Sequence, residues 1–179
     1  MVKSTVMIAF RTAVEVVSGM AKIARIISGG QTGVDRAALD AARFAGIPIC
    51  GWCPRGGWAE DLPAPPGLLS MYPELIETES AGVEQRTKLN VRDSHATLII
   101  AVGPRDISSG TAFTIDIAKL YRRPYFVADN AAADDIAAWL CTLGEELTLN
   151  IAGPRESKSP GIYEKSYRLL KKLLSSLAT

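Results

Sequence analysis

Residues 22–46 read KIARIISGGQTGVDRAALDAARFAG, and this stretch decides the fold. A β-branched run over residues 22–28 is ended by glycines, which predicts a strand. Apolar residues then recur at i, i+3, i+4 and i+7, which predicts a helix over residues 34–45. These positions are Val34, Ala37, Ala38, Ala41, Ala42 and Ala45. Because nearly all of them are alanine, the helix can lie very close to a sheet, and Gly46 ends it.

The same alternation of strands and helices continues along the chain. Further strands are predicted over residues 47–50, 75–78, 96–102, 124–128 and 147–152, and further helices over 83–93, 111–120, 134–143 and 160–177. Residues 51–73 are rich in glycine and proline and are predicted to form a long loop, a kind of segment that is usually functional or mobile. The pattern predicts an α/β, Rossmann-like fold: an open, mostly parallel sheet with helices on both faces.

Composition narrows the class of protein. The formal net charge is +1 and no basic stripe with interleaved aromatics occurs, so a nucleic-acid partner is not expected. No apolar run is long enough to cross a membrane. Three cysteines cannot all pair within one chain, and no export signal is recognised, so a cytoplasmic location with reduced thiols is expected.

Residues 20–179 are expected to form a single ligand-binding domain that begins near Met20. Two interpretations of residues 1–19 stay open. One is an N-terminal extension or a mis-called start, and the other is a short additional helix or edge strand.

Three loops share one plan, in which a strand leads through a Gly/Ser/Thr-rich turn into a helix. They cover residues 28–33, 108–111 and 157–161, and in a parallel sheet they meet at one rim. Glycines allow close approach of the backbone, and helix N-termini offer free N–H groups to anions. The sequence therefore predicts a site for a phosphorylated small molecule. Its candidate binding residues are Gly29, Gly30, Gln31, Thr32, Gly33, Arg36, Ser109, Gly110, Thr111, Lys158, Ser159 and Gly161.

Neighbouring side chains extend this interpretation. Lys158, Arg105 and Arg155 could neutralise a bound anion. A valine at Gly30 or Gly110 is expected to fill the seat of the anion. Asp35 is interpreted as favourable to the helix dipole, whereas Arg36 opposes that dipole and indicates either a ligand or a carboxylate partner.

Other kinds of site find little support. There is no P-loop motif, and no acidic residue ends the second strand to hold the ribose of NAD. Cys50 and Cys53 spell C-x-x-C, but no helix begins there to stabilise a thiolate, so they are interpreted as partly buried thiols at a strand end. His95 is expected at the amino end of a strand, opposite the rim. No catalytic residue and no metal ligand is therefore assigned.

Several motifs, taken in order, resemble the molybdenum cofactor carrier protein family. They are residues 27–40, 51–54 with 59–61, 86–87 with 90–94, 109–111, and 150–157, and the resemblance covers residues 22–178. Two positions depart from the family pattern. His95 stands where an aspartate is expected, and Gly57 stands where a second basic residue is common.

The resemblance implies a Rossmann-like fold related to the lysine-decarboxylase-like and cytokinin-activating phosphoribohydrolase group. It also implies binding of a molybdopterin-type cofactor by a homo-oligomer, with the role of Mg²⁺ open. The phosphoribohydrolases carry a catalytic glutamate where this chain has Thr114. Carriage or storage of molybdenum cofactor is therefore favoured over catalysis. The alternatives are an enzyme acting on a nucleoside monophosphate-like phosphoribosyl compound, with Glu60, Asp61 or Glu156 as its acid, and a nucleotide sensor without turnover.

Overall fold

Parallel strands pair into one six-stranded sheet in a computed structural model that describes residues 21–101 and 109–177. The strands are β1 (Ile23–Ile27), β2 (Ile49–Cys53), β3 (Leu75–Glu77), β4 (Ala96–Ala101), β5 (Tyr125–Asp129) and β6 (Leu147–Ala152). The helices are α1 (Val34–Phe44), α2 (Val83–Arg92), α3 (Ser109–Leu120), α4 (Ala133–Cys141) and α5 (Ile162–Ser176). The Rossmann-like α/β architecture predicted from the sequence is confirmed.

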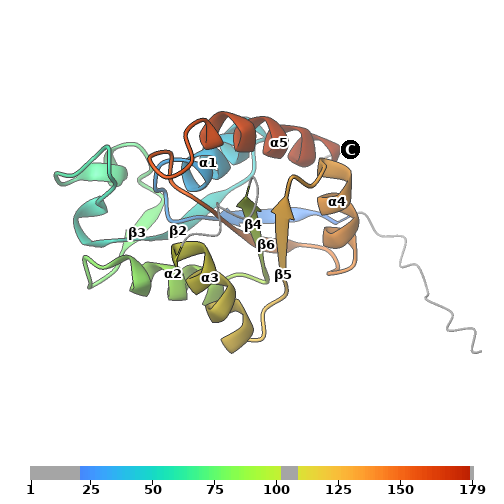
Figure 1. The fold of residues 1–179 in the computed structure, drawn as a ribbon, viewed down its shortest axis with the longest axis horizontal. Helices are drawn as coiled ribbons and strands as arrows, with labels where there is room; N and C mark the ends of the chain where they lie inside the picture. The colour runs from blue at the N-terminus through green and yellow to red at the C-terminus, as the bar shows by residue number, and fades with distance from the viewer. Residues whose placement is uncertain (1–20, 102–108, 178–179) are drawn as a thin grey trace, which may run out of the picture.

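The strand order β3-β2-β1-β6-β4-β5 places the chemistry-bearing loops side by side. Every neighbouring pair in the sheet is parallel, so all carboxyl ends lie at one rim. β6 lies between β1 and β4, and these are the three strands that precede the Gly/Ser/Thr-rich segments. Helices α1, α4 and α5 cover one face of the sheet, and α2 and α3 cover the other (Figure 1).

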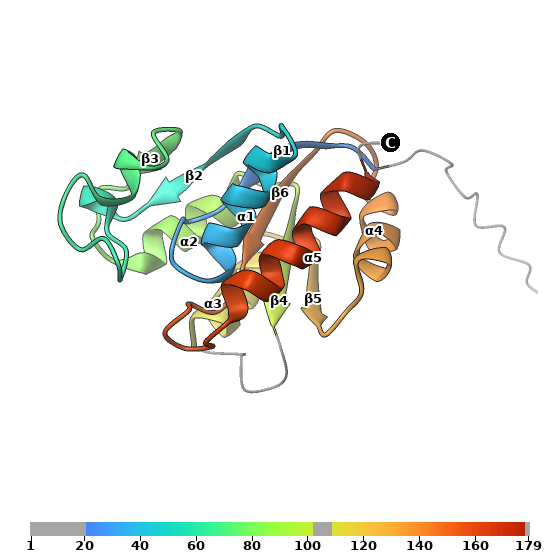
Figure 2. The same ribbon diagram turned by 90° about the horizontal axis from the view of Figure 1, so that it is seen from above.

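Helix α1 is buried because it lies on the sheet with α5 beside it (Figure 2). Its alanines are fully buried, since a methyl group allows helix and strand backbones to approach closely: Ala37, Ala38, Ala41 and Ala42. Asp40 joins the surrounding elements. It accepts hydrogen bonds from the hydroxyls of Tyr72 (2.6 Å) and Tyr163 (2.8 Å). Strand β4 is buried along its whole length, as its unbroken apolar run predicts.

The segment predicted as one long loop, residues 51–73, is partly regular. Strand β2 continues to Cys53, and two short 3-10 turns follow, η1 (Arg55–Gly57) and η2 (Gly67–Ser70). In the sequence Gly51 indicated the end of the strand, but it lies inside β2. A glycine is needed there because a Cβ would collide with the carbonyl group of Ser28, the residue that follows β1. Residues 1–19, Arg105 and Ser108 lie outside the described residues.

Candidate functional site

A cavity of about 470 Å³ opens at the carboxyl rim of the sheet, beside β4 and β6. This volume lies within the range of small-molecule sites in proteins. Among the described residues, its lining comes from the turn after β1 and the first turn of α1, the amino-terminal turns of α2 and α3, the carboxyl halves of β4 and β6, and the segment between β6 and α5. Its polar lining comprises Gln31, Asp35, Glu84, Arg86, Thr87, Ser109, Thr111, Thr114, Arg155 and Lys158.

The predicted binding residues divide into two groups. Five of them line the cavity: Gln31, Ser109, Gly110, Thr111 and Lys158. The other seven do not line it: Gly29, Gly30, Thr32, Gly33, Arg36, Ser159 and Gly161. Ser109, Gly110 and Thr111 belong to the first turn of α3 and not to a loop that precedes the helix. The three segments converge on one rim, but only part of the first and part of the third line the cavity.

The glycines of the first loop make room for other parts of the chain. A Cβ at Gly29 would lie 2.7 Å from Cζ of Arg86, and one at Gly33 would lie 2.8 Å from the backbone nitrogen of Glu156. At Gly30 a Cβ would lie 3.0 Å from a methyl carbon of Leu75 and 3.2 Å from one of Leu68. The expectation that a side chain at Gly30 would fill an anion seat is therefore corrected, since it would meet leucine side chains.

Arg36 has the carboxylate partner that its position in the first helical turn indicated. Its two terminal nitrogens donate to both oxygens of Asp61 at 3.0 and 3.1 Å, and Nε donates to the carbonyl of Gly30 at 3.1 Å. Bidentate pairing of this kind fixes both partners. Arg36 therefore fastens the segment after β2 to the loop after β1, away from the cavity.

Glu60 joins three segments of the rim. Its carboxylate accepts hydrogen bonds from the hydroxyl of Thr32, and from the hydroxyl (2.6 Å) and backbone nitrogen (3.3 Å) of Ser157. The side-chain oxygen of Gln31 accepts from the backbone nitrogens of Thr32 (3.1 Å) and Glu60 (2.9 Å). Thr32 thus holds the shape of the rim and does not line the cavity.

These carboxylates predict a loss of stability in acid. Partial burial favours a higher pKa at Glu60, but hydrogen bonds from Ser157 and Thr32 outweigh it and hold the pKa below its ordinary 4.5. The hydrogen bonds from Arg36 hold the pKa of Asp61 below its ordinary 3.8. Their contribution is complete above about pH 4.5 and is lost as the pH falls through the lowered values. As the pH falls below about 4.5, the melting temperature of the wild type should fall. It should fall less steeply in the double variant Glu60→Gln/Asp61→Asn. Equal slopes would contradict this account of the rim.

Glu156 performs a structural task at the start of α5. Its carboxylate accepts from the backbone nitrogens of Gly161 and Tyr163, the latter at 2.9 Å. It therefore satisfies N–H groups that the helix itself leaves unpaired. Together with Glu60 and Asp61, it completes the set of acids that the enzymatic alternative would recruit. None of the three lines the cavity.

The cavity contains an ion pair that the sequence did not indicate. Nη1 of Arg86, on α2, donates to Oδ2 of Asp35, on α1, at 2.9 Å. The side chains are only 14% and 3% exposed. Burial raises the pKa of Asp35, and the Arg86 guanidinium opposes that rise. From the sequence alone, the position of Asp35 indicates a favourable interaction with the helix dipole, whereas the structure pairs it with an arginine 51 positions away.

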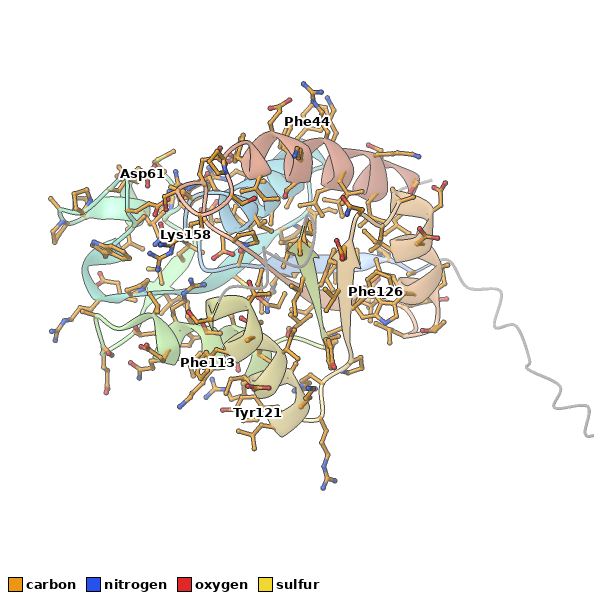
Figure 3. The ribbon with its side chains drawn as sticks, in the orientation of Figure 1. Phe44, Asp61, Phe113, Tyr121, Phe126 and Lys158 are labelled. Carbon is orange, nitrogen blue, oxygen red and sulfur yellow. The ribbon has the colours of Figure 1, made fainter. Side chains whose placement is uncertain are left out.

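The rest of the cavity combines cations with apolar walls. Arg155 and Lys158 add positive charge, and the Arg155 guanidinium lies 5.4 Å from the ring centroid of Trp58. Apolar lining comes from Val83, Ile99, Phe113 and Pro154. Lys158 lies on the loop before α5 and Phe113 on α3, across the rim from it (Figure 3). Such a site offers positive charge and apolar surface to a small ligand.

The remaining candidate groups lie elsewhere. Cys50 and Cys53 are three positions apart on β2 and therefore face opposite sides of the sheet. Burial raises the pKa of Cys50 and raises that of Cys53 to about 11, which disfavours the reactive thiolate. The ring nitrogen Nδ1 of His95 accepts from the backbone nitrogen of Thr148, at the amino end of β6 and away from the rim.

In residues 21–101 and 109–177, no group of three or more His, Cys, Asp or Glu side chains is arranged to hold a metal ion. None of the helices in the same ranges is long and apolar enough to cross a membrane.

The chain is similar in sequence to a known protein family and in sequence and fold to a solved structure. The model of the circularly permutated YpsA SLOG family matches residues 26–174. A crystal structure from Syntrophus aciditrophicus SB, named "Putative molybdenum carrier protein", is 40% identical in sequence and superposes with a TM-score of 0.77. The match covers 86% of this chain and 96% of that one. No curated protein matches this chain.

Proposed function

The chain belongs to the circularly permutated YpsA SLOG family, and on that premise we propose that it binds and carries molybdenum cofactor in the rim cavity. The likeness to a protein named as a molybdenum carrier supports this ligand. The observation that carries the proposal is the cavity itself, which brings Arg86, Arg155 and Lys158 together with apolar walls. Molybdenum cofactor carries a phosphate and an oxidised metal centre, both anionic, on a pterin ring system.

The phosphate of the ligand is assigned to the polar side of the cavity. Arg86 and Lys158 supply positive charge there, and the first turn of α3 adds the hydroxyls of Ser109 and Thr111. Helix N-termini favour anions through their N–H groups and their dipole. The pterin is assigned to Val83 and Phe113, whose side chains offer apolar surface at the same cavity.

Carriage without turnover is supported by what the carboxylates do. Glu60, Asp61 and Glu156 hold the rim together and do not line the cavity. At the position of the phosphoribohydrolase glutamate, the hydroxyl of Thr114 donates to the carbonyl of Gly110 at 3.0 Å. Among the described residues, the carboxylates that line the cavity are Asp35, which is paired with Arg86, and Glu84, which is exposed.

Titration of the ligand-free protein with isolated molybdenum cofactor and with AMP tests this function. Cofactor should bind more tightly than AMP, and no free base should be released from AMP. Lys158→Ala should weaken cofactor binding a few-fold, since one exposed charge contributes about 1 kcal/mol or less. Lys165→Ala, on the exposed face of α5, is the matched control and should leave affinity unchanged. If the wild type released free base from AMP and Glu84→Gln abolished that release, the protein would be an enzyme and not a carrier.

We also infer a homo-oligomer that works in the cytoplasm. Leu120 and Tyr121 leave 69% and 39% of their surface exposed, at the outer end of α3 (Figure 3). Large exposed apolar side chains at one place are typical of contact surfaces. The three free cysteines suit a reducing compartment. Whether Mg²⁺ accompanies the ligand is read from metal analysis of the loaded protein.

A further inference from the structure

The guanidinium of Arg86 lies in a closely fitted setting. One side is covered by Gly29, where a Cβ would lie 2.7 Å from Cζ of Arg86 and 3.0 Å from Oδ2 of Asp35. On a second side, Nη1 of Arg86 donates a hydrogen bond to Asp35. Any residue other than glycine at position 29 would therefore displace the guanidinium from its carboxylate partner. The role of this glycine is to admit an arginine from α2.

A small second cavity lies against the same guanidinium. It measures about 10 Å³, and Arg86, Thr87, Thr114 and Ala152 line both it and the main cavity. Asn90 and Asn150 add polar side chains to its lining, and Gly29 and Ile151 complete it. Within the described residues, Nε of Arg86 is buried and has no hydrogen-bond partner. A buried donor of this kind is costly unless it is satisfied, and the cavity has the size of one water molecule with several polar neighbours.

We propose that Gly29, Asp35 and one ordered water in the small cavity are positioning elements that fix the Arg86 guanidinium for the ligand in the main cavity. Asp35 holds Nη1 and the water accepts from Nε, which leaves the remaining N–H groups of the guanidinium for the ligand. A guanidinium held in advance loses little conformational freedom when an anion binds. The proposal rests on the proposed function only in assigning an anion to the main cavity.

The first test needs no ligand. The Nε–H resonance of Arg86 in ¹H–¹⁵N spectra, identified by its loss in Arg86→Lys, should exchange slowly and show magnetisation transfer from a bound water. Gly29→Ala should shift this resonance and speed its exchange. The atoms that the new methyl meets belong to flexible ends of side chains, and position 29 has no left-handed φ, so the fold should persist. Gly144→Ala, where a Cβ meets nothing within 4 Å, should leave the resonance unchanged.

The second test uses the affinity for inorganic pyrophosphate, measured by calorimetry. Gly29→Ala keeps every charge, yet it should weaken binding about tenfold. Asp35→Ala separates two explanations by sign. Removal of a negative charge would strengthen anion binding through electrostatics alone, whereas loss of positioning should weaken it. Asp35→Asn, which retains an acceptor for Nη1, should restore part of the affinity.

The two tests fail in different ways. The positioning proposal would be overturned, whatever the ligand is, if the Nε–H of Arg86 exchanged rapidly with solvent in the wild type. It would also be overturned if Gly29→Ala left the resonance and its exchange rate unchanged. Tighter pyrophosphate binding by Asp35→Ala would overturn it as well. If the resonance behaves as expected but the wild type binds no pyrophosphate, the positioning of Arg86 stands, and the assignment of an anion to the main cavity, which the proposed function requires, fails.

Discussion

Replacement of Arg86 by glutamine should weaken binding of the phosphate-bearing ligand about 30- to 150-fold. A hydrogen bond to a charged group contributes about 1.5–3 kcal/mol, and the larger part of that range applies to a side chain that is mostly buried. Arg86 is only 14% exposed and lines the cavity. Calorimetric titration of both proteins with molybdenum cofactor measures the change. A loss smaller than threefold would remove Arg86 from the proposed site.

The same substitution should destabilise the fold in a manner that depends on pH. It leaves the buried carboxylate of Asp35 without a cation, which typically costs about 3–5 kcal/mol. Burial already raises the pKa of Asp35, and loss of Arg86 raises it further. A carboxyl group whose pKa is raised in the folded protein destabilises the fold at pH values above that raised pKa. It has no effect below its pKa in the unfolded chain, 3.8. The difference in the free energy of unfolding between wild type and Arg86→Gln should therefore become smaller as the pH falls from 7.5.

A double variant separates the two effects of Arg86→Gln. Adding Asp35→Asn removes the unpaired charge, so it should recover part of the melting temperature at pH 7.5. It should recover none of the ligand affinity, because Arg86 is still absent. Recovery of affinity together with stability would mean that Arg86 acts only on the fold and does not bind the ligand.

Alanine at Gly33 is expected to destabilise the protein by about 3–5 kcal/mol. Gly33 precedes α1 with a φ of 77° and a ψ of −129°, a conformation that side chains rarely adopt. Left-handed strain contributes about 1–3 kcal/mol, and overpacking contributes a similar amount. Its Cβ would meet the backbone of residues 154–156, which cannot turn aside as a side chain does. The melting temperature should fall by roughly 10 °C or more.

Gly144→Ala is the matched control for strain alone. Gly144 has a φ of 99°, and a Cβ there meets nothing within 4 Å. Alanine at this position should cost about 1–2 kcal/mol, clearly less than alanine at Gly33. Equal losses in the two variants would show that the contact between the loops after β1 and β6 adds nothing to stability.

Much of the fold could be predicted because its signals are local. The unbroken apolar run of β4 and the alanine stripe of α1 depend only on residues close in sequence, and both elements form as predicted. The exception is the end of β2. Gly51 indicated a turn in the sequence. In the structure its lack of a Cβ makes room for the carbonyl of Ser28, which follows the neighbouring strand β1 and lies 23 positions away in the chain.

The site was predictable at the level of loops and less so at the level of residues. Carboxyl ends of parallel strands share a rim, so Gln31, Ser109 and Lys158 could be placed there from the order of elements. Asp35 and Arg36 are neighbours in sequence, yet one faces Arg86 and the other Asp61. Those partners come from distant segments. Their choice depends on where α2 and the segment after β2 pack, which no local pattern reports.

Native mass spectrometry of protein purified gently from its host, with metal analysis of the same sample, identifies the bound ligand directly. We expect a bound pterin phosphate with stoichiometric molybdenum or tungsten, on an assembly of more than one subunit. A bound nucleotide in its place would contradict the carriage of molybdenum cofactor. So would an empty protein that afterwards takes up nucleotide but not molybdenum cofactor.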